Sequence, residues 1–245
     1  MRSDAERRAV HDLLERGYSD GEVAERTGVP RNTVGRWRRA GPPVSIRWRP
    51  SHLRSYGYLL GLYLGDGCAT VNRRGGVMLR ICLGTEYPRI IEDCCAALVL
   101  SMPECRPRFA PLAGIQAVHV QVNGKRWLHA FPQHGPGRKH ERRIALEDWQ
   151  QEIVDRHPDE FVRGLIHSDG CRTTNRFRTR LPSGRVAEYA YGRYFFSNLS
   201  EDIRGLFCTA CDALDVRWTL SNPRNVSVAH RASVARLDAI GCAKG

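Results

Sequence analysis

The sequence predicts an α+β protein, with a small all-α domain in front of a body that is built from two similar halves. At 245 residues the chain is longer than one average domain, and a prior of roughly 150 residues per domain favours at least two units. A segment that begins at Gly61 recurs at Gly164, which indicates an internal duplication. The apolar content of 42% is ordinary for a globular protein, so most of the chain should fold.

Residues 1–41 predict a domain of three short helices. Ser19 and Glu22 have the spacing of a capping box, in which each side chain satisfies a backbone N–H of the other, and they mark the start of a second helix. Gly28 suits the tight turn after this helix, because glycine adopts a positive φ without strain. Pro30 then opens a third helix.

The third helix has an apolar side, with Val34 and Trp37, and a polar side. The arrangement resembles the helix-turn-helix of bacterial regulators and recombinases, whose second helix enters the major groove. The residues predicted to contact DNA from this helix are Arg31, Asn32, Thr33 and Arg36. The alternative is a helical unit that only packs on the body. Side chains that suit base edges favour the DNA-binding interpretation.

The excess of positive charge indicates a nucleic-acid partner. The chain carries 38 Lys and Arg against 26 Asp and Glu, a net charge of +12, and only Lys125, Lys139 and Lys244 are lysines. Arginine presents a planar fork of donors that matches phosphate and the guanine edge. The arginine-rich segment 42–54 is predicted to be a basic linker along the phosphate backbone. A GC-rich genome would explain the preference for arginine over lysine, but not the net sign.

Membrane and secreted proteins are disfavoured. The sequence has no run of 18 apolar residues, so we expect no membrane partner, and no export signal follows Met1. We expect a cytoplasmic, nucleoid-associated protein whose nine cysteines are free thiols. Cys208 and Cys211 have the spacing of a zinc-ligand pair, but no second pair lies at finger spacing, so thiols in the core are the better interpretation.

The internal repeat contains many polar identities at one constant offset of 103 residues. Gly61-Leu62-x-x-x-Asp66-Gly67-Cys68-x-Thr70-x-Asn72-Arg73 recurs as Gly164-Leu165-x-x-x-Asp169-Gly170-Cys171-x-Thr173-x-Asn175-Arg176. Chance agreement of this kind is improbable. We therefore predict two pseudo-equivalent halves, 55–132 and 158–245, joined by a basic connecting loop and helix over 133–157.

After each copy of the motif, the hydrophobic periodicity predicts the same order of elements: two strands, a helix, two strands and a closing helix. In the first half these are strands over 68–74 and 77–83, a helix over 87–100, strands near 106 and over 115–123, and a helix from Lys125. In the second half they are strands over 171–181 and 186–196, a helix over 201–214, strands over 216–221 and 226–230, and a helix from Ala232.

The two nine-residue segments LLGLYLGDG, from Leu59, and VRGLIHSDG, from Val162, resemble the two motifs of a single-chain LAGLIDADG homing endonuclease. The similarity covers about residues 55–240. The resemblance implies a pseudo-twofold αββαββα body with curved antiparallel sheets, acting as a monomer. It also implies Mg²⁺-dependent, site-specific cleavage of double-stranded DNA. Two motifs in register with a repeat of this length are more specific than a single motif.

The motif spacing predicts that Asp66 and Asp169 meet. Small residues on one face of each motif helix, Gly65 and Ser168 among them, allow the helices to approach closely. Two carboxylates at helix C-termini repel each other and the helix dipoles, and a divalent cation removes this conflict. We therefore predict both aspartates as catalytic, and a metal site of Asp66, Asp169, Gly65 and Ser168. The alternative is that each aspartate only ends a helix that a glycine terminates.

The resemblance also implies a basic residue near the start of the helix that closes each half. Lys125 fits this place as a further catalytic residue, and Arg231 is a looser counterpart in the second half. The alternative for both is a solvated surface charge. Leu64 and His167 depart from the family, in which an acidic residue is common at that position.

The body's predicted DNA contacts come from strands and from the connecting loop. Arg176, Arg178 and Arg180 alternate with apolar or small residues, so they should share one face of a strand, as should His119, Gln121 and Asn123. A curved sheet with an apolar back under helices and a face of Arg, Gln, Asn and His can lie in the major groove, so we expect these residues on the face away from the helices. The predicted set is Arg80, His119, Gln121, Asn123, Arg138, Lys139, Arg176, Arg178 and Arg180. His134 and His140 are alternatives as metal ligands or as a general base, but no carboxylate-rich segment surrounds them, which favours phosphate contacts.

Three functions are compatible with these features. The leading one is a Mg²⁺-dependent DNA endonuclease, because both motif aspartates are present. The second is a sequence-specific transcription regulator that uses the same fold without cleavage, which the helix-turn-helix favours. The third is an RNA-splicing helper with the same basic surface. Fold alone does not separate them.

Overall fold

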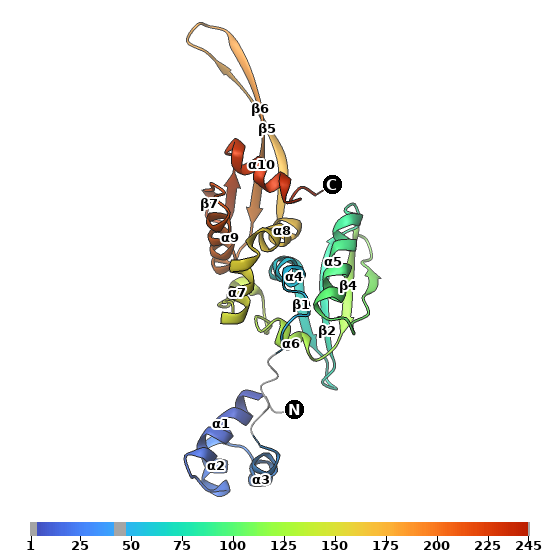
Figure 1. Cartoon of the computed structure of the whole chain (residues 1–245), viewed down its shortest axis with the longest axis vertical. Helices are drawn as coiled ribbons and strands as arrows, with labels where there is room; N and C mark the ends of the chain where they lie inside the picture. The colour runs from blue at the N-terminus through green and yellow to red at the C-terminus, as the bar shows by residue number, and fades with distance from the viewer. Residues whose placement is uncertain (1–3, 42–47, 245) are drawn as a thin grey trace. The chain divides into compact units, whose positions relative to one another are not determined.

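The computed structural model describes residues 4–41 and 48–244. The chain divides into two compact units, Met1–Arg47 and Trp48–Gly245 (Figure 1). The first part of the predicted linker, residues 42–47, lies outside the described residues. Its last part belongs to the second unit, because Trp48 is buried there and packs against Tyr56 with ring centroids 5.5 Å apart. None of the described helices is long and apolar enough to span a membrane.

The N-terminal unit has the three predicted helices, α1 (Asp4–Glu15), α2 (Asp20–Thr27) and α3 (Arg31–Ala40). The predicted capping box is present: the Ser19 N–H donates to Glu22 Oε2 at 2.8 Å, and Ser19 Oγ accepts from the Glu22 N–H. Gly28 ends α2 with φ of +66°. Val34 and Trp37 are buried, as the pattern predicts, and they pack with Val10, Val23 and Val29.

The body contains the predicted order of elements twice. The first half consists of α4 (Leu53–Asp66), β1 (Gly67–Val71), β2 (Val77–Gly84), α5 (Pro88–Ser101), β3 (Arg108–Pro111), β4 (Ala117–Asn123) and α6 (Trp127–Ala130). The second half consists of α8 (Pro158–Asp169), β5 (Gly170–Arg180), β6 (Val186–Ser197), α9 (Glu201–Ala213), β7 (Thr219–Asn222), β8 (Asn225–Val228) and α10 (Arg231–Ala239). A 3₁₀ turn, η1 (Lys139–Glu141), and helix α7 (Asp148–Arg156) connect them.

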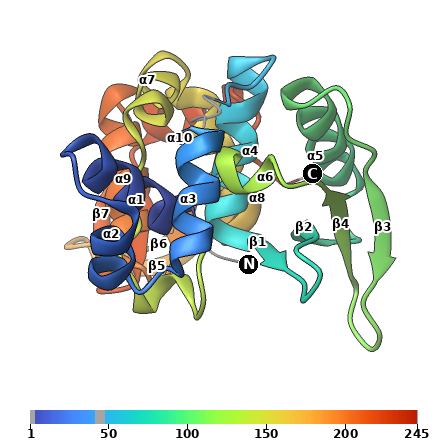
Figure 2. The same ribbon diagram turned by 90° about the horizontal axis from the view of Figure 1, so that it is seen from below.

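The two sheets have the same antiparallel topology. Their strand orders are β1-β2-β4-β3 and β5-β6-β8-β7, so corresponding strands occupy corresponding places. Each sheet has an apolar face under helices. In β2, residues such as Leu79 and Ile81 are buried while those between them are partly exposed. Helix α5 lies against this sheet (Figure 2). This alternation of buried and exposed side chains confirms the predicted duplicated α+β body.

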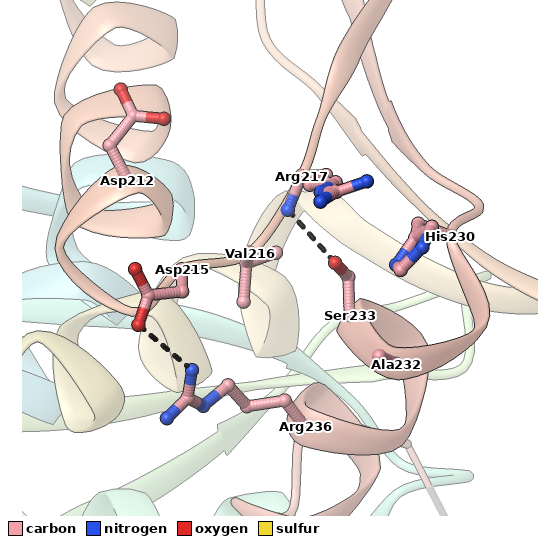
Figure 3. A pocket seen from close by; sticks show the side chains of 8 residues that line it. All are labelled: Asp212, Asp215, Val216, Arg217, His230, Ala232, Ser233 and Arg236. Atoms are coloured by element: carbon pink, nitrogen blue, oxygen red, sulfur yellow. Dashed lines mark hydrogen bonds and ion pairs between the residues drawn. The ribbon is translucent and has the colours of Figure 1, made fainter.

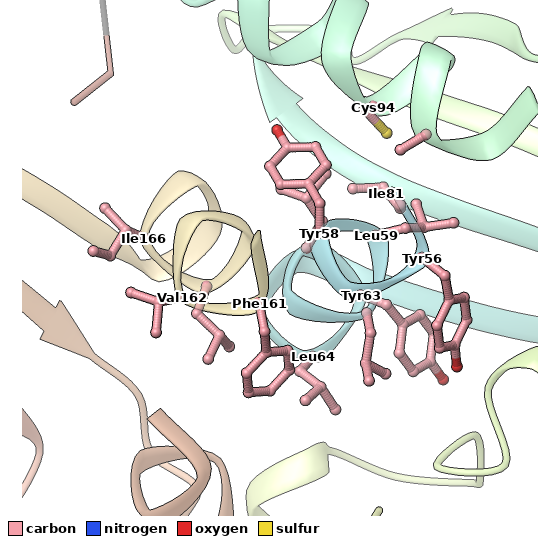
Figure 4. Close-up of a cluster of buried hydrophobic side chains, with 14 of the residues drawn as sticks. Tyr56, Tyr58, Leu59, Tyr63, Leu64, Ile81, Cys94, Phe161, Val162 and Ile166 are labelled. Atoms are coloured by element: carbon pink, nitrogen blue, oxygen red, sulfur yellow. The ribbon is translucent and has the colours of Figure 1, made fainter. Parts of the chain in front are cut away.

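Helices α4 and α8 form the centre of the body and cross at very short range (Figure 4). A Cβ atom added to Gly61 would lie 2.5 Å from the Phe161 carbonyl oxygen, and one added to Gly164 would lie 2.1 Å from the Tyr58 carbonyl oxygen. Only glycine fits at these two positions. The small residues of the motif therefore set the crossing distance, and the side chains around it, including Leu59, complete the core.

The predicted helix from Lys125 is only the single turn α6. Its end coincides with Phe131, which precedes Pro132, and the residue before a proline is disfavoured in helical conformation. Phe131 instead stacks on Tyr63 at 4.0 Å between ring centroids. Packing of this ring against α4 therefore replaces a longer closing helix.

The two halves differ most at their first hairpins. Strands β1 and β2 have 5 and 8 residues, whereas β5 and β6 have 11 and 12. The longer hairpin extends past α10 and away from the helices of the body (Figure 1). Its outer part therefore has no helix packed on either face.

Candidate active site at the ends of the motif helices

The two motif aspartates lie at neighbouring helix ends. Asp66 is the last residue of α4 and Asp169 is the last residue of α8. A Cβ atom added to Gly65 would lie 2.2 Å from Ser168 Oγ and 3.0 Å from Asp169 Oδ2, so the helix ends are in direct contact. Both aspartates line one cleft of about 520 Å³, together with Leu64, Gly65, Gly67, Cys68, Gly137, Arg138, Lys139, His140, Ser197, Asn198 and Leu199.

Both carboxylates are difficult to keep ionised in this cleft. Burial raises the pKa of Asp66 to about 6, and the neighbouring Asp169 contributes to this rise. Burial also raises the pKa of Asp169, but Asn198 Nδ2 donates a hydrogen bond of 2.6 Å to Asp169 Oδ2 and opposes the rise. Sequence reasoning did not identify Asn198, because an Asn that follows a strand is also a common turn residue.

Two of the chain's three lysines reach this site. Lys139 Nζ donates to the carbonyl oxygens of Tyr63, Leu64 and Gly65, the last two at 3.0 Å. Lys244 Nζ donates to the Ser168 carbonyl oxygen at 2.8 Å. Each ammonium therefore satisfies the carbonyl end of one motif helix, where a positive charge is favoured.

The lysines also interact with the aspartates. Burial lowers the pKa of Lys139 to about 8, and the charges of Asp169 and Asp66 oppose this decrease. Burial likewise lowers the pKa of Lys244, and Asp66 and then Asp169 oppose it. Two cations and two anions thus share one largely buried site, and shifted pKa values of this kind are typical of functional sites.

The structure brings Lys139 and Lys244, rather than Lys125, to the aspartates. Lys125 is exposed in the turn before α6 and does not line the cleft. Lys139 was predicted only as a DNA contact, and Lys244 was not predicted. One signal was available: each of these lysines follows its motif aspartate at nearly the same spacing.

His167 has a structural position next to the site. Its Nε2 donates to the Gly241 carbonyl oxygen at 2.9 Å, and its Nδ1 accepts from the Tyr58 hydroxyl at 2.9 Å. Burial lowers the pKa of His167 to about 4, so the ring is neutral at physiological pH. His167 therefore holds the start of the segment that carries Lys244. At the equivalent position of the first half, Leu64 is an apolar core residue.

The first sheet presents the predicted polar residues on one open face. Arg80 pairs with Gln121, and Asn123 pairs with Met78, in antiparallel register. Arg80, His119 and Gln121 are half-buried and alternate with buried valines or with Leu79 and Ile81, whereas Asn123 is exposed. Paired residues of neighbouring strands lie on the same side of a sheet. All four side chains therefore share the face opposite to the helices.

The second sheet places the predicted arginines on the other face. Arg172 pairs with the buried Tyr194, and the alternation continues from there through Arg176, Arg178 and Arg180. These arginines therefore lie on the side that, within the body, packs under helices. Arg178 is also paired with Glu188 at 2.5 Å. The sequence pattern correctly puts the three arginines on one face, but on the face opposite to the one expected.

Two further groups of predicted DNA contacts lie on α3 and in the connecting segment. On α3, Arg31, Asn32 and Arg36 are exposed and Thr33 is half-buried. Arg138 is exposed at the rim of the cleft. The predicted DNA contacts of the body thus lie in three places: the cleft, the open face of the first sheet and, for the three arginines of β5, the opposite face of the second sheet.

A second cavity lies between the end of α9, the segment 215–217 that follows it, and the start of α10 (Figure 3). Its polar groups bond mainly with one another or with near neighbours. Ser233 Oγ accepts from the Arg217 N–H at 2.9 Å, and Arg236 pairs with Asp215 at 3.4 Å. Asp212 accepts from Trp218 Nε1 at 2.7 Å. These hydrogen bonds and the ion pair stabilise the local fold, so we assign this cavity no catalytic role.

The donor chemistry of the cleft fits a hard divalent cation. Asp66 and Asp169 supply carboxylate oxygens, and the Gly65 and Ser168 carbonyl oxygens lie beside them, although these already accept hydrogen bonds from lysines. Among the described residues no group of three or more His, Cys, Asp or Glu side chains is placed to share a metal. A cation here would therefore complete its oxygen shell with water or phosphate, which is characteristic of Mg²⁺.

Comparison with known proteins finds similarities for both units of the chain. A family model described as a homeodomain-like domain matches residues 1–40. The chain matches no curated protein sequence. A structure of mesophilic variants of the homing endonuclease I-DmoI is similar, with a TM-score of 0.50, 13% identity, and coverage of 77% of this chain and 95% of that chain.

Two further similar structures have slightly lower scores. The LAGLIDADG meganuclease I-AabMI bound to uncleaved DNA has a TM-score of 0.47 and 11% identity, and the match covers 76% of this chain and 82% of that one. I-DmoI in complex with DNA and Ca has a TM-score of 0.48 and 15% identity, over 77% and 89% of the two chains. The similarity to the I-DmoI variants, at a TM-score of 0.50, confirms for the fold the resemblance seen in the motifs: the body has the fold of the LAGLIDADG homing endonucleases, behind a homeodomain-like N-terminal region.

Proposed function

We propose that this chain is a site-specific endonuclease that hydrolyses phosphodiester bonds of double-stranded DNA. The observation that carries the proposal is the shared cleft, in which Asp66 and Asp169 meet beside Lys139 and Lys244. A pair of carboxylates raised in pKa, with cations at hydrogen-bonding distance from their helix ends, is a costly arrangement for a structural role alone.

Asp66 and Asp169 would hold Mg²⁺ through their carboxylate oxygens, with the carbonyl oxygens of Gly65 and Ser168 nearby. Bound there, the ion would activate water and stabilise charge on the phosphate oxygens. The protein's own contribution is to fix both carboxylates at one point, through the contact of Gly65 with Ser168. Asn198 holds one Asp169 oxygen and thereby orients that carboxylate.

Lys139 and Lys244 take the role that the sequence suggested for Lys125. Their ammonium groups stabilise negative charge on the scissile phosphate, since both already lie beside the two carboxylates. The pKa of Lys139, about 8, allows Nζ to give or take a proton near neutral pH. Replacing either lysine should therefore lower the rate of cleavage more than the affinity for DNA.

DNA would lie along the open face of the first sheet, against Arg80, His119, Gln121 and Asn123, with Arg138 near the cleft. The homeodomain-like unit would contribute a second contact through Arg31, Asn32, Thr33 and Arg36. We infer a monomer, because the two halves supply one aspartate each to a single cleft. A domain organisation of 1–41, 42–54, 55–132, 133–157 and 158–245 goes with this proposal, as does a nucleoid-associated, cytoplasmic location.

The test is cleavage of a DNA library with Mg²⁺, followed by sequencing of the ends. Wild type should produce ends at one defined site, while Asp66→Asn and Asp169→Asn should lower the cleavage rate by at least about a hundredfold. Asp215→Asn is the control, because this acid is exposed and does not line the cleft. Specific footprints without any strand scission, identical in the two aspartate variants, would contradict the nuclease.

Metal binding has a readout that does not depend on cleavage. Mg²⁺ should raise the Tm of wild type in proportion to RT ln(1 + [Mg²⁺]/Kd), and this rise should vanish in either aspartate variant. Lys139→Met and Lys244→Met should retain the rise and lose cleavage.

A transcription regulator is the second candidate, and the homeodomain-like match to residues 1–40 favours it. It predicts sequence-specific binding without scission, and binding that does not respond to Asp66→Asn. The cleavage experiment therefore distinguishes the two functions.

A further inference from the structure

The long hairpin formed by β5 and β6 has two chemically different faces beyond the edge of the body. One face continues the open side of the second sheet and carries Phe177, Tyr189 and Tyr191. The other face carries Arg176 and Arg180, with Arg178 beside Glu188. The first half has no counterpart, since β1 and β2 end well before such a length.

The aromatic side chains form one exposed cluster. Phe177 stacks on Tyr189 with centroids 5.2 Å apart, and Tyr191 meets Phe177 edge-on at 6.2 Å. Their relative exposures are 45%, 45% and 38% for Phe177, Tyr189 and Tyr191. Asn175 Nδ2 donates to the Tyr191 hydroxyl at 2.7 Å and holds that ring in place. The cluster is therefore an ordered aromatic surface.

Stabilisation of the hairpin explains part of this cluster, but it does not explain why three aromatic rings are exposed. A cross-strand aromatic pair such as Phe177 and Tyr189 stabilises two paired strands. A third exposed ring, fixed by Asn175, adds apolar surface that water contacts. On the side of the cluster nearer the hairpin turn, the next pair is Thr179 and Ala187, whose small side chains leave space beside the rings.

Charge decides between possible partners for the hairpin. Residues 170–197 contain six arginines and a single acidic residue, Glu188, which is already paired with Arg178. A second copy of this chain would bring another equally basic hairpin and a net charge of +12, so the two would repel. Nucleic acid matches both faces of the hairpin. Its phosphates are negatively charged, as the arginine face requires, and its flat bases can stack on the aromatic face.

We propose that the β5–β6 hairpin binds DNA whose strands are locally separated. Bases of one strand stack on the face with Phe177, Tyr189 and Tyr191, and phosphates of the other strand contact Arg176 and Arg180. The proposal rests on the proposed function for its ligand, DNA, but not on cleavage. It assigns the hairpin a role in distorting DNA at one side of the site, which the shorter β1–β2 hairpin does not share.

The experiment compares two labelled duplexes of equal length, one fully paired and one with a short central bubble of mismatched thymidines. Affinity of the full chain is measured by fluorescence anisotropy in EDTA, so that cleavage plays no part. Wild type should bind the bubble about tenfold more tightly, a typical effect of base–aromatic stacking. Phe177→Leu with Tyr189→Leu should abolish this preference and leave affinity for the paired duplex within about twofold.

Three controls separate stacking from folding and charge. Leu220→Ser removes another exposed apolar residue of the same sheet and should keep the preference. Phe177→Tyr with Tyr189→Phe keeps both rings and should also keep it. The double change Arg176→Gln with Arg180→Gln should make the slope of log K against log[salt], for binding to the bubble duplex, shallower by about two.

Equal affinity of wild type for the two duplexes would overturn the proposal. An unchanged preference in the double leucine variant would do the same, as would the loss of a dimer by that variant in sedimentation velocity, which would assign the cluster to a second copy. Asp66→Asn should retain the bubble preference. Failure of the nuclease and failure of this inference are therefore separate results.

Discussion

The two halves of the body share their element order but support their motif aspartates differently. Asp169 accepts a hydrogen bond from Asn198. At the equivalent place after β2 stands the exposed Thr85, whose N–H donates to Gln116 as that of Asn198 donates to Arg224. Within the described part of the chain, no side chain donates a hydrogen bond to the Asp66 carboxylate. The cleft is thus electrostatically asymmetric, although it is built from a duplicated motif. The negative charge of Asp66 depends more than that of Asp169 on positively charged groups nearby.

The contact between α4 and α8 is the feature in which the halves agree, and breaking it should have the largest effect. Gly61→Ala and Gly164→Ala would place a Cβ at 2.5 Å and 2.1 Å from a backbone oxygen of the other helix. Each should lower the free energy of unfolding by about 3 kcal/mol or more, because backbone cannot give way cheaply. Urea denaturation measures this loss.

Gly205→Ala is the matched control, since Gly205 lies in α9 and its added Cβ would meet nothing within 4 Å. It should raise stability by about 0.5–1 kcal/mol, as expected for glycine in a helix. A small cost at only one of the two motif glycines would show that the halves are not equivalent at the crossing.

His167 and Leu64 occupy equivalent positions, and changing His167→Leu makes the halves alike there. The change leaves the buried Tyr58 hydroxyl and the Gly241 carbonyl without their hydrogen bonds to the ring. The free energy of unfolding should fall by about 1–3 kcal/mol. Because Gly241 leads to Lys244, cleavage should fall as well, beyond the loss of stability.

A double-mutant cycle with Tyr58→Phe identifies the source of this cost. Once the hydroxyl is absent, His167→Leu should cost less by about 1 kcal/mol. Additive losses in the cycle would mean that the Tyr58 contact has no energetic role.

The asymmetry of the aspartates can be measured without metal. In EDTA at neutral pH, Asp66→Asn should stabilise the protein by roughly 1 kcal/mol, because it removes a buried charge that lacks a hydrogen-bond donor. Asp169→Asn should stabilise it less, since Asn198 already supports that carboxylate. Thermal unfolding of both variants tests the order, and equal shifts would remove the distinction between the halves.

The parts of the fold that depend on local periodicity could be predicted from the sequence. Alternation over 77–83 and 115–123 gave both the strands and the open face with Arg80 and Gln121. For β5 the same rule predicted the strand but not which of its faces is open to solvent. Phe177 has the side chain of a core residue, yet it is exposed in the part of the hairpin beyond the helices. Alternation alone does not say where a hairpin leaves the body.

The lysines of the cleft could not be placed by periodicity. Lys139 lies in a connecting turn, and Lys244 in a segment after α10 that Gly241 and His167 hold against α8. Their positions depend on long-range contacts, which a local pattern does not contain. Lys125 fitted the expected local context, but the turn there is too short and ends at Phe131, before Pro132.

The smallest expected effect concerns an ion pair that only the second half contains. Arg172 and the Tyr194 hydroxyl both bind Asp238, and the hydrogen bond from Arg172 holds the pKa of that carboxyl below its usual range. An Asp with a lowered pKa in the folded state stabilises the protein above its unfolded pKa and loses that contribution as pH falls. Stability should therefore decrease by under about 1 kcal/mol from pH 5 downward, since the pair is partly exposed.

Asp238→Asn should flatten this part of the pH profile, measured by urea denaturation. Asp215→Asn, at a more exposed ion pair, should leave the profile unchanged. An identical profile in Asp238→Asn and wild type would mean that the pair adds nothing to the difference between the halves.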